Sequence, residues 1–368
     1  MKNPRFNIEI VQGDVLEFPA DVLVLKYAQA YHGVDDAVSS LLVERGVVAL
    51  NKLKPTPGSH VWVDTEGLLP SSSVLFVGVS SLGDFGYTEI EDFARRALSI
   101  VEQDRPEAER IAITLHGAGY GLDEIEALHS EFRGILGSLN AGKAPKRLNR
   151  VLIVERDVNR VTRLRAALGQ LALKPIKSPS PRLPKPQKGV PRVAGGRGSR
   201  RGKYPEVEQL AFNTIAKQKR GTSIETTVST LESAGQVEKK PKVFVAMPFS
   251  SEMEDVFYFG IQNPVRQLGY ICERVDQEAF TGDILDQVRS RIENAELVIA
   301  DLTGANPNVY LEVGYAWGKA RPTVLVINKS DELRFDVHGQ RCLRYQSIKH
   351  LENQLSNELK NLPPNKKV

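Results

Sequence analysis

A basic segment without a single acidic residue divides this 368-residue chain into two parts. Between Lys174 and Lys203 the chain carries ten Lys or Arg residues, six Pro residues and then a cluster of Gly. Such a composition cannot bury enough apolar surface to offset the entropy of ordering the chain. We therefore predict a disordered linker over 174–203, with one domain before it over 1–173 and another after it over 240–368.

The linker also determines the net charge. The chain has 49 Lys and Arg residues against 45 Asp and Glu, and removing the ten basic residues of the linker changes the formal charge from +4 to −6. Arg197, Arg200, Arg201 and Lys203 suit contacts with phosphates, so the segment is either a solvated tether or a contact for nucleic acid or another acidic partner. No aromatic residue is interleaved to stack on bases, which favours the tether.

Residues 204–239 form a bridge between the linker and the second domain. Val207, Leu210, Ala211 and Ile215 recur at helical spacing, which predicts one amphipathic helix before a Thr- and Ser-rich stretch. We expect this helix to dock on a neighbouring domain or on another subunit, and both alternatives stay open.

Composition excludes several classes of protein. With 41% hydrophobic and 26% charged residues, the chain is neither wholly disordered nor collagen-like. No apolar run approaches the roughly 20 residues that span a bilayer, and the N-terminus lacks the apolar core of a signal peptide, so we expect a cytoplasmic protein without membrane contact. Two cysteines and six scattered histidines give no metal-ligand spacing and no disulfide framework, so we expect no metal and no cofactor.

The N-terminal part alternates strand-like and helix-like segments. The pattern predicts strands at residues 6–11, 21–27, 73–79, 110–117 and 150–157, and helices at 88–103, 123–139 and 159–168. This alternation is typical of a three-layer α/β domain, in which helices cover both faces of a mixed or parallel sheet. Ligands of such sheets bind beyond the carboxyl ends of the strands.

Two glycine-containing loops follow predicted strands of this domain. Gly13-Asp14 comes after the first strand, and the run HGAGYG at 116–121 comes between a strand and a helix. Glycines let backbone amides approach a phosphate, and the following helix N-terminus favours an anion. A tight strand-to-helix turn has the same pattern, so both interpretations stay open. The candidate residues of a ligand loop are Asp14, Gly117, Gly119 and Gly121.

The order IVQGDV, ADVLVLKYAQA and GVDDAV resembles a macro domain, or the related N-terminal domain of leucyl aminopeptidases. HGAGYGLD likewise resembles the phosphate-loop region of that fold. The resemblance covers about residues 5–170 and implies a Rossmann-like sensor or recruitment domain. In ADP-ribose-binding macro domains an asparagine pair follows the second strand, whereas Lys26-Tyr27-Ala28-Gln29 stands here. The resemblance therefore implies the scaffold and leaves the ligand open.

The C-terminal part predicts a second α/β domain. Strands are expected at 242–250, 270–276, 297–304 and 323–328, and helices at 255–268, 284–294 and 308–320. This order predicts a doubly wound parallel sheet, so the fold class is α/β with two Rossmann-like three-layer domains. We expect Arg289 and Arg291 on an exposed or subunit-facing helix side. The inner face of the first helix is expected to carry Val256, Phe259, Ile261, Val265 and Leu268.

Polar residues fall at the carboxyl ends of these strands. Met247-Pro248-Phe249, Asp276 and Asp301 each end a predicted strand, and Glu312 lies early in the next helix, which Asn306-Pro307-Asn308 opens. We expect Asp301 and Glu312 to face one pocket, with the small residues Gly314 and Ala316 letting a ring or ribose approach. Two carboxylates in one pocket suit attack at, or ionic stabilisation of, a sugar anomeric carbon.

Each of these carboxylates also has a structural interpretation. Asp301 followed by Thr303 fits a turn or helix cap, and Glu312 fits an ordinary carboxylate that complements the helix dipole. Asp276 fits a solvated loop. The residues alone leave both interpretations open.

VFVAMPF, followed by IENAELVIADLTGANPNVYLEVGYAWGKARPTVLVIN, resembles the nucleoside 2-deoxyribosyltransferase family and its TIR-like relatives over about residues 242–328. The resemblance implies that Glu312 is the nucleophile on the sugar C1′ and that Asp301 contacts the base or assists its departure. It also implies that Met247, Pro248 and Phe249 line the base pocket. Further substrate-binding candidates are Asp276, Asn308, Gly314 and Tyr315.

The chain departs from the transferases at its first turn, where Ala246-Met247-Pro248-Phe249 replaces a small Ala-Gly-Pro turn. The difference favours a nucleotide or dinucleotide over a free deoxynucleoside, and in TIR-like relatives a glutamate on the comparable helix cleaves the nicotinamide–ribose bond of NAD. We therefore predict an N-glycosidase that acts on a nucleotide or NAD through Glu312. The alternative is a module that binds a nucleotide second messenger without cleaving it.

Two further expectations rest on analogy. A sensor joined to a nucleotide-destroying domain is the layout of bacterial defence proteins, so we expect a role in antiviral defence. The transferases complete their sites with neighbouring subunits, so we expect a homo-oligomer.

Overall fold

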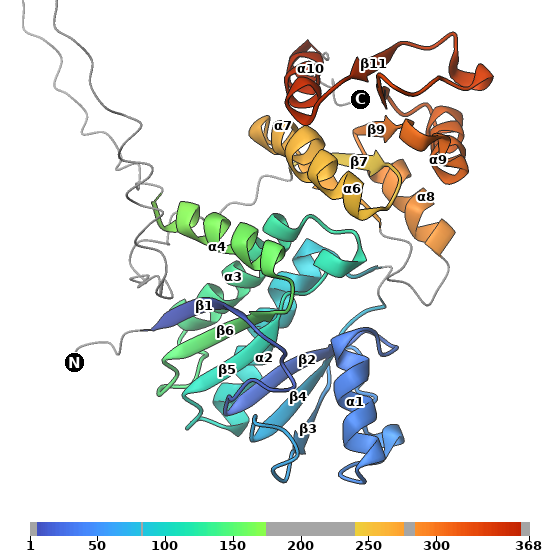
Figure 1. Ribbon diagram of the computed structural model, residues 1–368. Coiled ribbons are helices and arrows are strands. Elements are labelled where there is room, and N and C mark those ends of the chain that lie inside the picture. Colours follow the sequence, from blue (N-terminus) through green and yellow to red (C-terminus); the bar gives the residue numbers. More distant parts are fainter. Residues whose placement is uncertain (1–5, 82–83, 174–239, 276–283, 362–368) are drawn as a thin grey trace, which may run out of the picture.

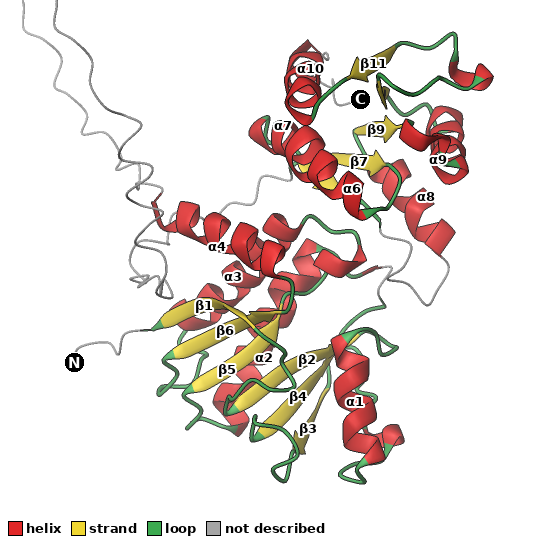
Figure 2. Ribbon diagram, in the orientation of Figure 1, coloured by secondary structure: helices red, strands yellow, loops and turns green. Residues whose placement is uncertain are grey.

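The computed structural model describes residues 6–81, 84–173, 240–275 and 284–361, which form two α/β domains (Figure 1, Figure 2). The expected fold class is confirmed in these parts of the chain. The predicted linker, the predicted helix of the bridge and Asp276 lie outside the described residues.

The N-terminal domain is built on a six-stranded sheet with the strand order β1-β6-β5-β2-β4-β3. Neighbouring strands are parallel except at the edge, where β3 pairs antiparallel with β4. Its elements are β1 (Asn7–Gln12), β2 (Val22–Tyr27), α1 (Val34–Glu44), β3 (His60–Asp64), β4 (Ser73–Gly78), α2 (Tyr87–Asp104), β5 (Arg110–Thr114), α3 (Glu124–Asn140), β6 (Arg150–Glu155) and α4 (Val158–Leu173), with 3-10 turns at Leu50–Lys52 and Ala118–Tyr120.

Helices cover both faces of this sheet because its central strands are apolar on both faces. Every residue of β2, VLVLKY, is buried. Val22 and Val24 pack with α2, α3 and α4 on one face, whereas Leu23 and Leu25 pack with α1 on the other (Figure 1). The alternation of side chains along the strand therefore divides the core into two layers.

The C-terminal domain is a five-stranded sheet with the order β11-β10-β9-β7-β8, parallel throughout, which confirms the predicted doubly wound arrangement. One face is covered by α6, α7 and α10, and the other by α8 and α9 (Figure 1). Its elements are β7 (Lys242–Ala246), α6 (Ser251–Asp255), a π-helical segment (Val256–Gln262), α7 (Asn263–Gln267), β8 (Ile271–Glu273), α8 (Ile284–Asn294), β9 (Leu297–Asp301), α9 (Pro307–Gly318), β10 (Thr323–Asn328), β11 (Cys342–Tyr345) and α10 (Ile348–Asn361).

The helix after β7 differs from the prediction on its inner face. The π-helical segment Val256–Gln262 closes its hydrogen bonds over five residues instead of four, which turns the following side chains away from α-helical register. Phe259, expected inside, is 56% exposed, and Phe257 is buried instead. Ile261 and Val265 are buried as predicted, since they lie on the face that packs against the sheet.

The two domains meet through buried polar groups. Asp123 of the N-terminal domain accepts hydrogen bonds from Arg266 Nε at 2.9 Å and Nη2 at 2.6 Å. Glu273 of the C-terminal domain accepts one from Tyr87 Oη at 3.0 Å. Both carboxylates are 3% exposed, and a buried charge is tolerated only when it is paired. These contacts therefore determine how the domains dock.

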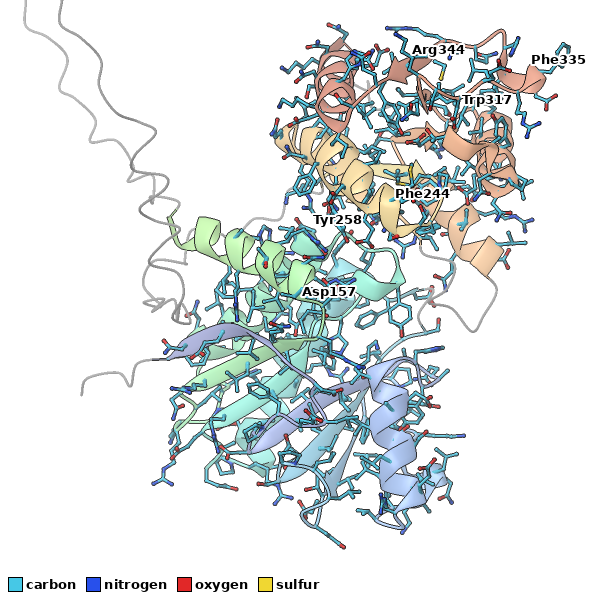
Figure 3. The ribbon with its side chains drawn as sticks, in the orientation of Figure 1. Asp157, Phe244, Tyr258, Trp317, Phe335 and Arg344 are labelled. Atoms are coloured by element: carbon cyan, nitrogen blue, oxygen red, sulfur yellow. The ribbon has the colours of Figure 1, made fainter. Side chains whose placement is uncertain are left out.

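An aromatic contact lies beside these polar pairs. Tyr258 projects from the C-terminal domain toward α4, as Figure 3 shows, and the Arg163 guanidinium lies 3.6 Å from its ring centroid. Arg163 is held in place by Glu124, which accepts its Nε at 2.6 Å. A guanidinium over an aromatic face is attractive, so this contact adds to the docking of the domains.

Two helical glycines predict opposite effects on stability. A Cβ at Gly134 in α3 would lie 2.2 Å from Glu91 O and 2.8 Å from Ala94 Cβ of α2, so Gly134→Ala should destabilise the protein by about 1–3 kcal/mol. A Cβ at Gly169 in α4 would have no heavy atom within 4 Å, so Gly169→Ala should stabilise it by about 0.5–1 kcal/mol. Urea unfolding of both variants measures the difference, and effects of the same sign would contradict the close approach of α2 and α3.

Candidate functional site

The strand order of the C-terminal sheet places a ligand site at its carboxyl edge. In the order β8-β7-β9-β10-β11, the chain proceeds outward in opposite directions from the border between β7 and β9. Open α/β sheets bind ligands outside that border. Met247-Pro248-Phe249 leaves β7 at this edge, and Leu302-Thr303 leaves β9. The structure therefore brings the predicted turn after β7 and the end of β9 to one edge.

Glu312 lies on the second turn of α9, the helix that follows β9. Asn306 caps this helix by accepting a hydrogen bond from Asn308 N at 2.9 Å. Val309 and Val313 bury one stripe of the helix, and Glu312 lies beside that stripe. Within the described residues Glu312 has no hydrogen-bond or ion-pair partner, and burial alone raises the pKa of its carboxyl to about 7. Such a group is a candidate for acid–base or ionic chemistry.

Asp301 ends β9 and is fully buried. Its Oδ1 accepts a hydrogen bond from Thr303 N at 3.0 Å, and its Oδ2 accepts one from Tyr345 Oη at 2.9 Å. Burial raises the pKa of Asp301, and these hydrogen bonds oppose the rise. Both oxygens thus have protein partners, so the structure shows Asp301 as part of the turn after β9, next to β11. It shows no contact between Asp301 and Glu312.

The turn after β7 is joined to the end of β8 by an arginine. Met247 is buried, whereas Pro248 and Phe249 are partly exposed. Arg274 follows β8 directly, with its guanidinium 5.0 Å from the ring centroid of Phe249 and its Nη1 3.9 Å from Met247 Sδ. Arg274 was not among the site residues predicted from sequence. Its signal was a cation near the carboxyl end of the strand predicted at 270–276, at the same edge as the aromatic turn.

The remaining predicted residues of α9 lie on different faces. Asn308 is exposed in the first turn. Gly314 lies about 160° around the helix from Glu312, and a Cβ there would meet open space. Tyr315 donates a hydrogen bond to Glu293 Oε1 on α8 at 2.5 Å. Ala316 is fully buried in the core. The pair Gly314 and Ala316 therefore does not form the small-residue surface beside Glu312 that was expected.

A cavity of about 520 Å³ lies at the carboxyl edge of the N-terminal sheet. It is formed by the ends of three strands, the start of α1 and the loop after β5. Its lining residues are Gly13, Val15, Lys26, His32, Gly33, Val34, Asp35, Thr114, Leu115, His116, Gly117, Tyr120, Val154, Glu155, Arg156 and Arg160.

Another cavity, of about 450 Å³, lies at the opposite edge of the same sheet. Asp21, Ser72 and Glu109 in its lining precede β2, β4 and β5. Because ligands of open α/β sheets bind at the carboxyl edge, we take the cavity beside α1 as the ligand cavity of this domain.

A buried ion pair lies inside the ligand cavity. Lys26 of β2 contacts Asp35 in the first turn of α1, and both side chains are at most 4% exposed. Asp35 Oδ1 has no hydrogen-bond partner among the described residues. The N-cap of α1, Gly33, has φ 58° and provides no side-chain cap. The start of α1 therefore presents uncapped backbone amides, which attract an anion.

His116 lines the cavity and Glu131 lies next to the backbone of His116, and both residues are buried. Neither ring nitrogen of His116 has a partner within the described parts of the chain. Burial lowers the pKa of His116 well below its usual value, and the charge of Lys26 adds to this effect. Burial raises the pKa of Glu131 to about 8. Both groups are therefore mainly neutral at pH 7, which makes their burial tolerable.

The predicted loop residues of this domain lie in three different environments. Gly117 lines the cavity, and Asp14 follows the lining residue Gly13, with its Oδ1 accepting a hydrogen bond from Leu16 N at 3.0 Å. Gly119 lies in the 3-10 turn Ala118–Tyr120. Gly121 packs against the C-terminal domain, since a Cβ there would lie 3.0 Å from Val275 Cγ2.

Two features are absent from the described residues. These residues contain no group of three or more His, Cys, Asp or Glu side chains arranged to hold a metal ion. None of their helices combines the length and the apolar character that crossing a membrane requires.

Comparisons with known proteins give similarities of fold. No protein-family model matches the chain, and no curated protein matches it. Among solved structures, a mutant macrodomain from Oceanobacillus iheyensis is 17% identical, with 46% of this chain and 95% of that chain covered and a TM-score of 0.34. The Trypanosoma brucei macrodomain in complex with ADP-ribose is also 17% identical, with 44% of this chain and 69% of that chain covered and a TM-score of 0.36.

A third similar structure is a CMP N-glycosidase from Clostridium botulinum. It is 17% identical, with 32% of this chain and 98% of that chain covered and a TM-score of 0.27. At this level of identity the ligand and the reaction have to be inferred from the chain's own residues.

The half-buried carboxyl of Glu312 predicts a pH-dependent stability. Folding raises its pKa from 4.5 to about 7, so the folded state binds this proton more tightly, and stability falls as the pH rises from about 4.5 to about 7. Glu312→Gln keeps a neutral group of similar shape. The unfolding free energy of the variant should therefore equal that of the wild type near pH 4. Near pH 8 it should be higher than that of the wild type by about 1–3 kcal/mol.

Urea unfolding at both pH values measures this difference. Glu358→Gln on α10 serves as the matched control. Because Glu358 is ion-paired with Arg341, neutralising it should lower the unfolding free energy of the protein. A pH-independent difference between Glu312→Gln and the wild type would show that Glu312 is not an uncompensated buried acid.

Proposed function

We propose that the C-terminal domain cleaves the N-glycosidic bond of a nucleotide, with Glu312 acting at the anomeric carbon of the sugar. The observation that supports this is an unpartnered, half-buried carboxyl on the helix that starts from the carboxyl edge of a doubly wound sheet. Its pKa near 7 is the kind of perturbation that marks catalytic acids and bases.

The reaction breaks the bond between C1′ and the base nitrogen. The electron pair of that bond leaves with the base, which takes up a proton, while C1′ passes through an oxocarbenium-like state. An ionised carboxylate beside C1′ stabilises that state as a counter-ion or captures it as a nucleophile. Water then attacks C1′ and breaks the bond to Glu312 where one has formed; its hydroxyl group stays on C1′ and its other proton balances the one that the base takes up. The products are the free base and the sugar phosphate, or nicotinamide, a proton and ADP-ribose when the substrate is NAD, whose base leaves without taking up a proton.

Asp301 serves the proposed site as a positioning residue. Its hydrogen bonds hold Thr303 and Tyr345, and Thr303 Oγ1 in turn accepts Asn328 N at 2.9 Å. This network connects the end of β9 to β10 and β11, and so sets the turn from which α9 starts. The contact of Asp301 with the departing base stays a prediction.

We propose a nucleotide or NAD as the substrate, and a phosphate group as part of what is recognised. Arg274 supplies a cation at the carboxyl edge, beside the ring of Phe249. A planar guanidinium suits bidentate contact with a phosphate, and an aromatic ring suits stacking on a base.

We infer that the N-terminal cavity binds a phosphorylated nucleotide and acts as a sensor. The uncapped start of α1 and the glycine loop at Gly117 offer backbone amides to a phosphate. Arg156 and Arg160 lie at the same cavity and add positive charge there, although Arg160 is also ion-paired with Glu155 and Glu124.

The second candidate is nucleotide binding in the C-terminal domain without cleavage. One observation favours it. Both oxygens of Asp301 accept hydrogen bonds, from Thr303 and Tyr345, so Asp301 does not provide a second free carboxylate beside Glu312 to assist the departure of the base. In that case the domain holds a nucleotide second messenger.

Antiviral defence in bacteria, assembly into a homo-oligomer and contact of the basic linker with nucleic acid or another acidic partner belong to the same proposal. They rest on the arrangement of a sensor-like domain, a basic tether and an effector-like domain in one chain.

The proposal is tested by chromatography of NAD, deoxynucleoside triphosphates, nucleoside monophosphates and deoxynucleosides after incubation with the full chain. We expect the wild type to release free base from a phosphorylated substrate. Glu312→Gln, which cannot ionise, should lower that rate by at least about 10³-fold, because the charge that stabilises the oxocarbenium-like state is gone.

Glu358→Gln on α10 is again the matched control and should keep the wild-type rate. Equal base release by Glu312→Gln and the wild type would overturn the role of Glu312. Intact substrates together with equal nucleotide retention by both proteins would replace the enzyme with the binding module.

A further inference from the structure

The loop that lines the N-terminal cavity also contacts the C-terminal domain. Arg291 of α8 donates to Tyr120 O at 2.9 Å and to Gly121 O at 3.4 Å. The same guanidinium donates to Glu273 Oε2 at 2.9 Å. The Arg291 side chain is only 15% exposed and lies between the domains, whereas an exposed or subunit-facing side was expected. One residue of the C-terminal domain thus holds two carbonyls of the cavity loop.

The loop has little room to move without moving its neighbours. Gly117 and Gly121 each have φ 85°, a left-handed conformation that favours glycine. A Cβ at Gly121 would lie 3.0 Å from Val275 Cγ2 and 3.1 Å from Arg274 O, so the loop backbone rests directly on the residues that follow β8. A displacement of the loop is therefore transmitted to the end of β8 by direct contact.

The same junction contains a buried carboxylate, so breaking one of its contacts alone is energetically unfavourable. Glu273 is 3% exposed and receives Tyr87 Oη and Lys242 Nζ, each at 3.0 Å, in addition to Arg291. Tyr87 Oη also accepts Asp123 N at 2.9 Å, next to the start of α3. Withdrawing Arg291 would leave a buried carboxylate with fewer partners, so the junction favours concerted rearrangement over independent motion of each contact.

Both ends of this junction reach a candidate site. On one side, Tyr120 lines the cavity, with its ring centroid 5.5 Å from Lys26 Nζ. On the other, Arg274 at the end of β8 contacts Phe249 and Met247 in the turn after β7. A continuous series of contacts therefore connects the cavity of the N-terminal domain to the carboxyl edge of the C-terminal sheet.

We propose that a nucleotide bound in the N-terminal cavity controls the C-terminal site through the loop 117–121 and Arg291. The proposal rests on the proposed function for its effect on catalysis, and on the contacts above for its route. A ligand that contacts Gly117 and Tyr120 orders the loop and strengthens its contacts with Arg291 and Val275. These contacts in turn restrict the motion of Arg274 and Phe249, which bind the substrate at the carboxyl edge of the C-terminal sheet. Binding at the two sites is then coupled in both directions.

Hydrogen–deuterium exchange of the full chain tests the route without requiring catalysis, with saturating ADP-ribose as the probe. We expect slower exchange at 115–121 and also at 271–275 and 284–294. In Arg291→Lys the first segment should still be protected and the other two should not, since an ammonium cannot donate to both carbonyls and Glu273 in the geometry of the guanidinium. Arg289→Lys, on the same helix but 53% exposed and paired with Asp286, should behave as the wild type.

Three exchange results would overturn the proposal. Protection confined to 115–121 in the wild type would show binding without transmission. Protection of 284–294 that persists in Arg291→Lys would show that ADP-ribose acts on the C-terminal domain by another route. Protection of no segment would remove the cavity as a nucleotide site, and the control with it.

The effect on catalysis is measured separately as the rate of base release with and without ADP-ribose. We expect ADP-ribose to lower the KM for the nucleotide by about fivefold or more in the wild type and in Arg289→Lys, and to leave it unchanged in Arg291→Lys. Base release that does not respond to ADP-ribose would overturn the control while leaving the glycosidase in place. Absence of base release would overturn the proposed function, while the exchange pattern would still decide the route.

Discussion

The arrangement of this molecule depends on carboxylates that are buried between its two domains. Asp123 is paired with Arg266 and Glu273 with Tyr87, each across the domain boundary. Removing Arg266 would leave Asp123 as an uncompensated buried charge, which costs about 3–5 kcal/mol, whereas Glu273 is also paired with Lys242 and Arg291. The pairs therefore hold the two sheets in one relative position, and that position places the loop of the N-terminal cavity against the end of β8.

Asp301 and Glu312, at the carboxyl edge of the C-terminal sheet, differ in their hydrogen-bond partners. This difference distinguishes a structural carboxylate from one that is available for chemistry. Asp301 is buried with a hydrogen bond to each oxygen, so its burial is compensated and it orders the turn after β9. Glu312 is half-buried without a partner among the described residues, and its pKa is raised to about 7 for that reason. The uncompensated group is the one that we assign to the anomeric carbon, because its charge is available to a ligand.

The regular parts of both sheets could be predicted from sequence because their strands are short apolar runs between turn residues. The edge strand β3 and the half-exposed β11 lack that signal, and the π-helical segment moved Phe259 to the surface against α-helical periodicity. Glu312 was found through its motif. The role of Arg291 was not, because the carbonyls of Tyr120 and Gly121 that it contacts lie about 170 residues away in the chain, and only the folded structure brings them together.

A crystal structure of the full chain carrying Glu312→Gln, soaked with AMP and CMP, tests the central assignment most directly. The account predicts a nucleotide at the carboxyl edge of the C-terminal sheet, with its C1′ about 3–3.5 Å from the side chain at position 312 and its phosphate at Arg274. A nucleotide found in the N-terminal cavity alone, or bound at the C-terminal edge with its sugar remote from position 312, would contradict it.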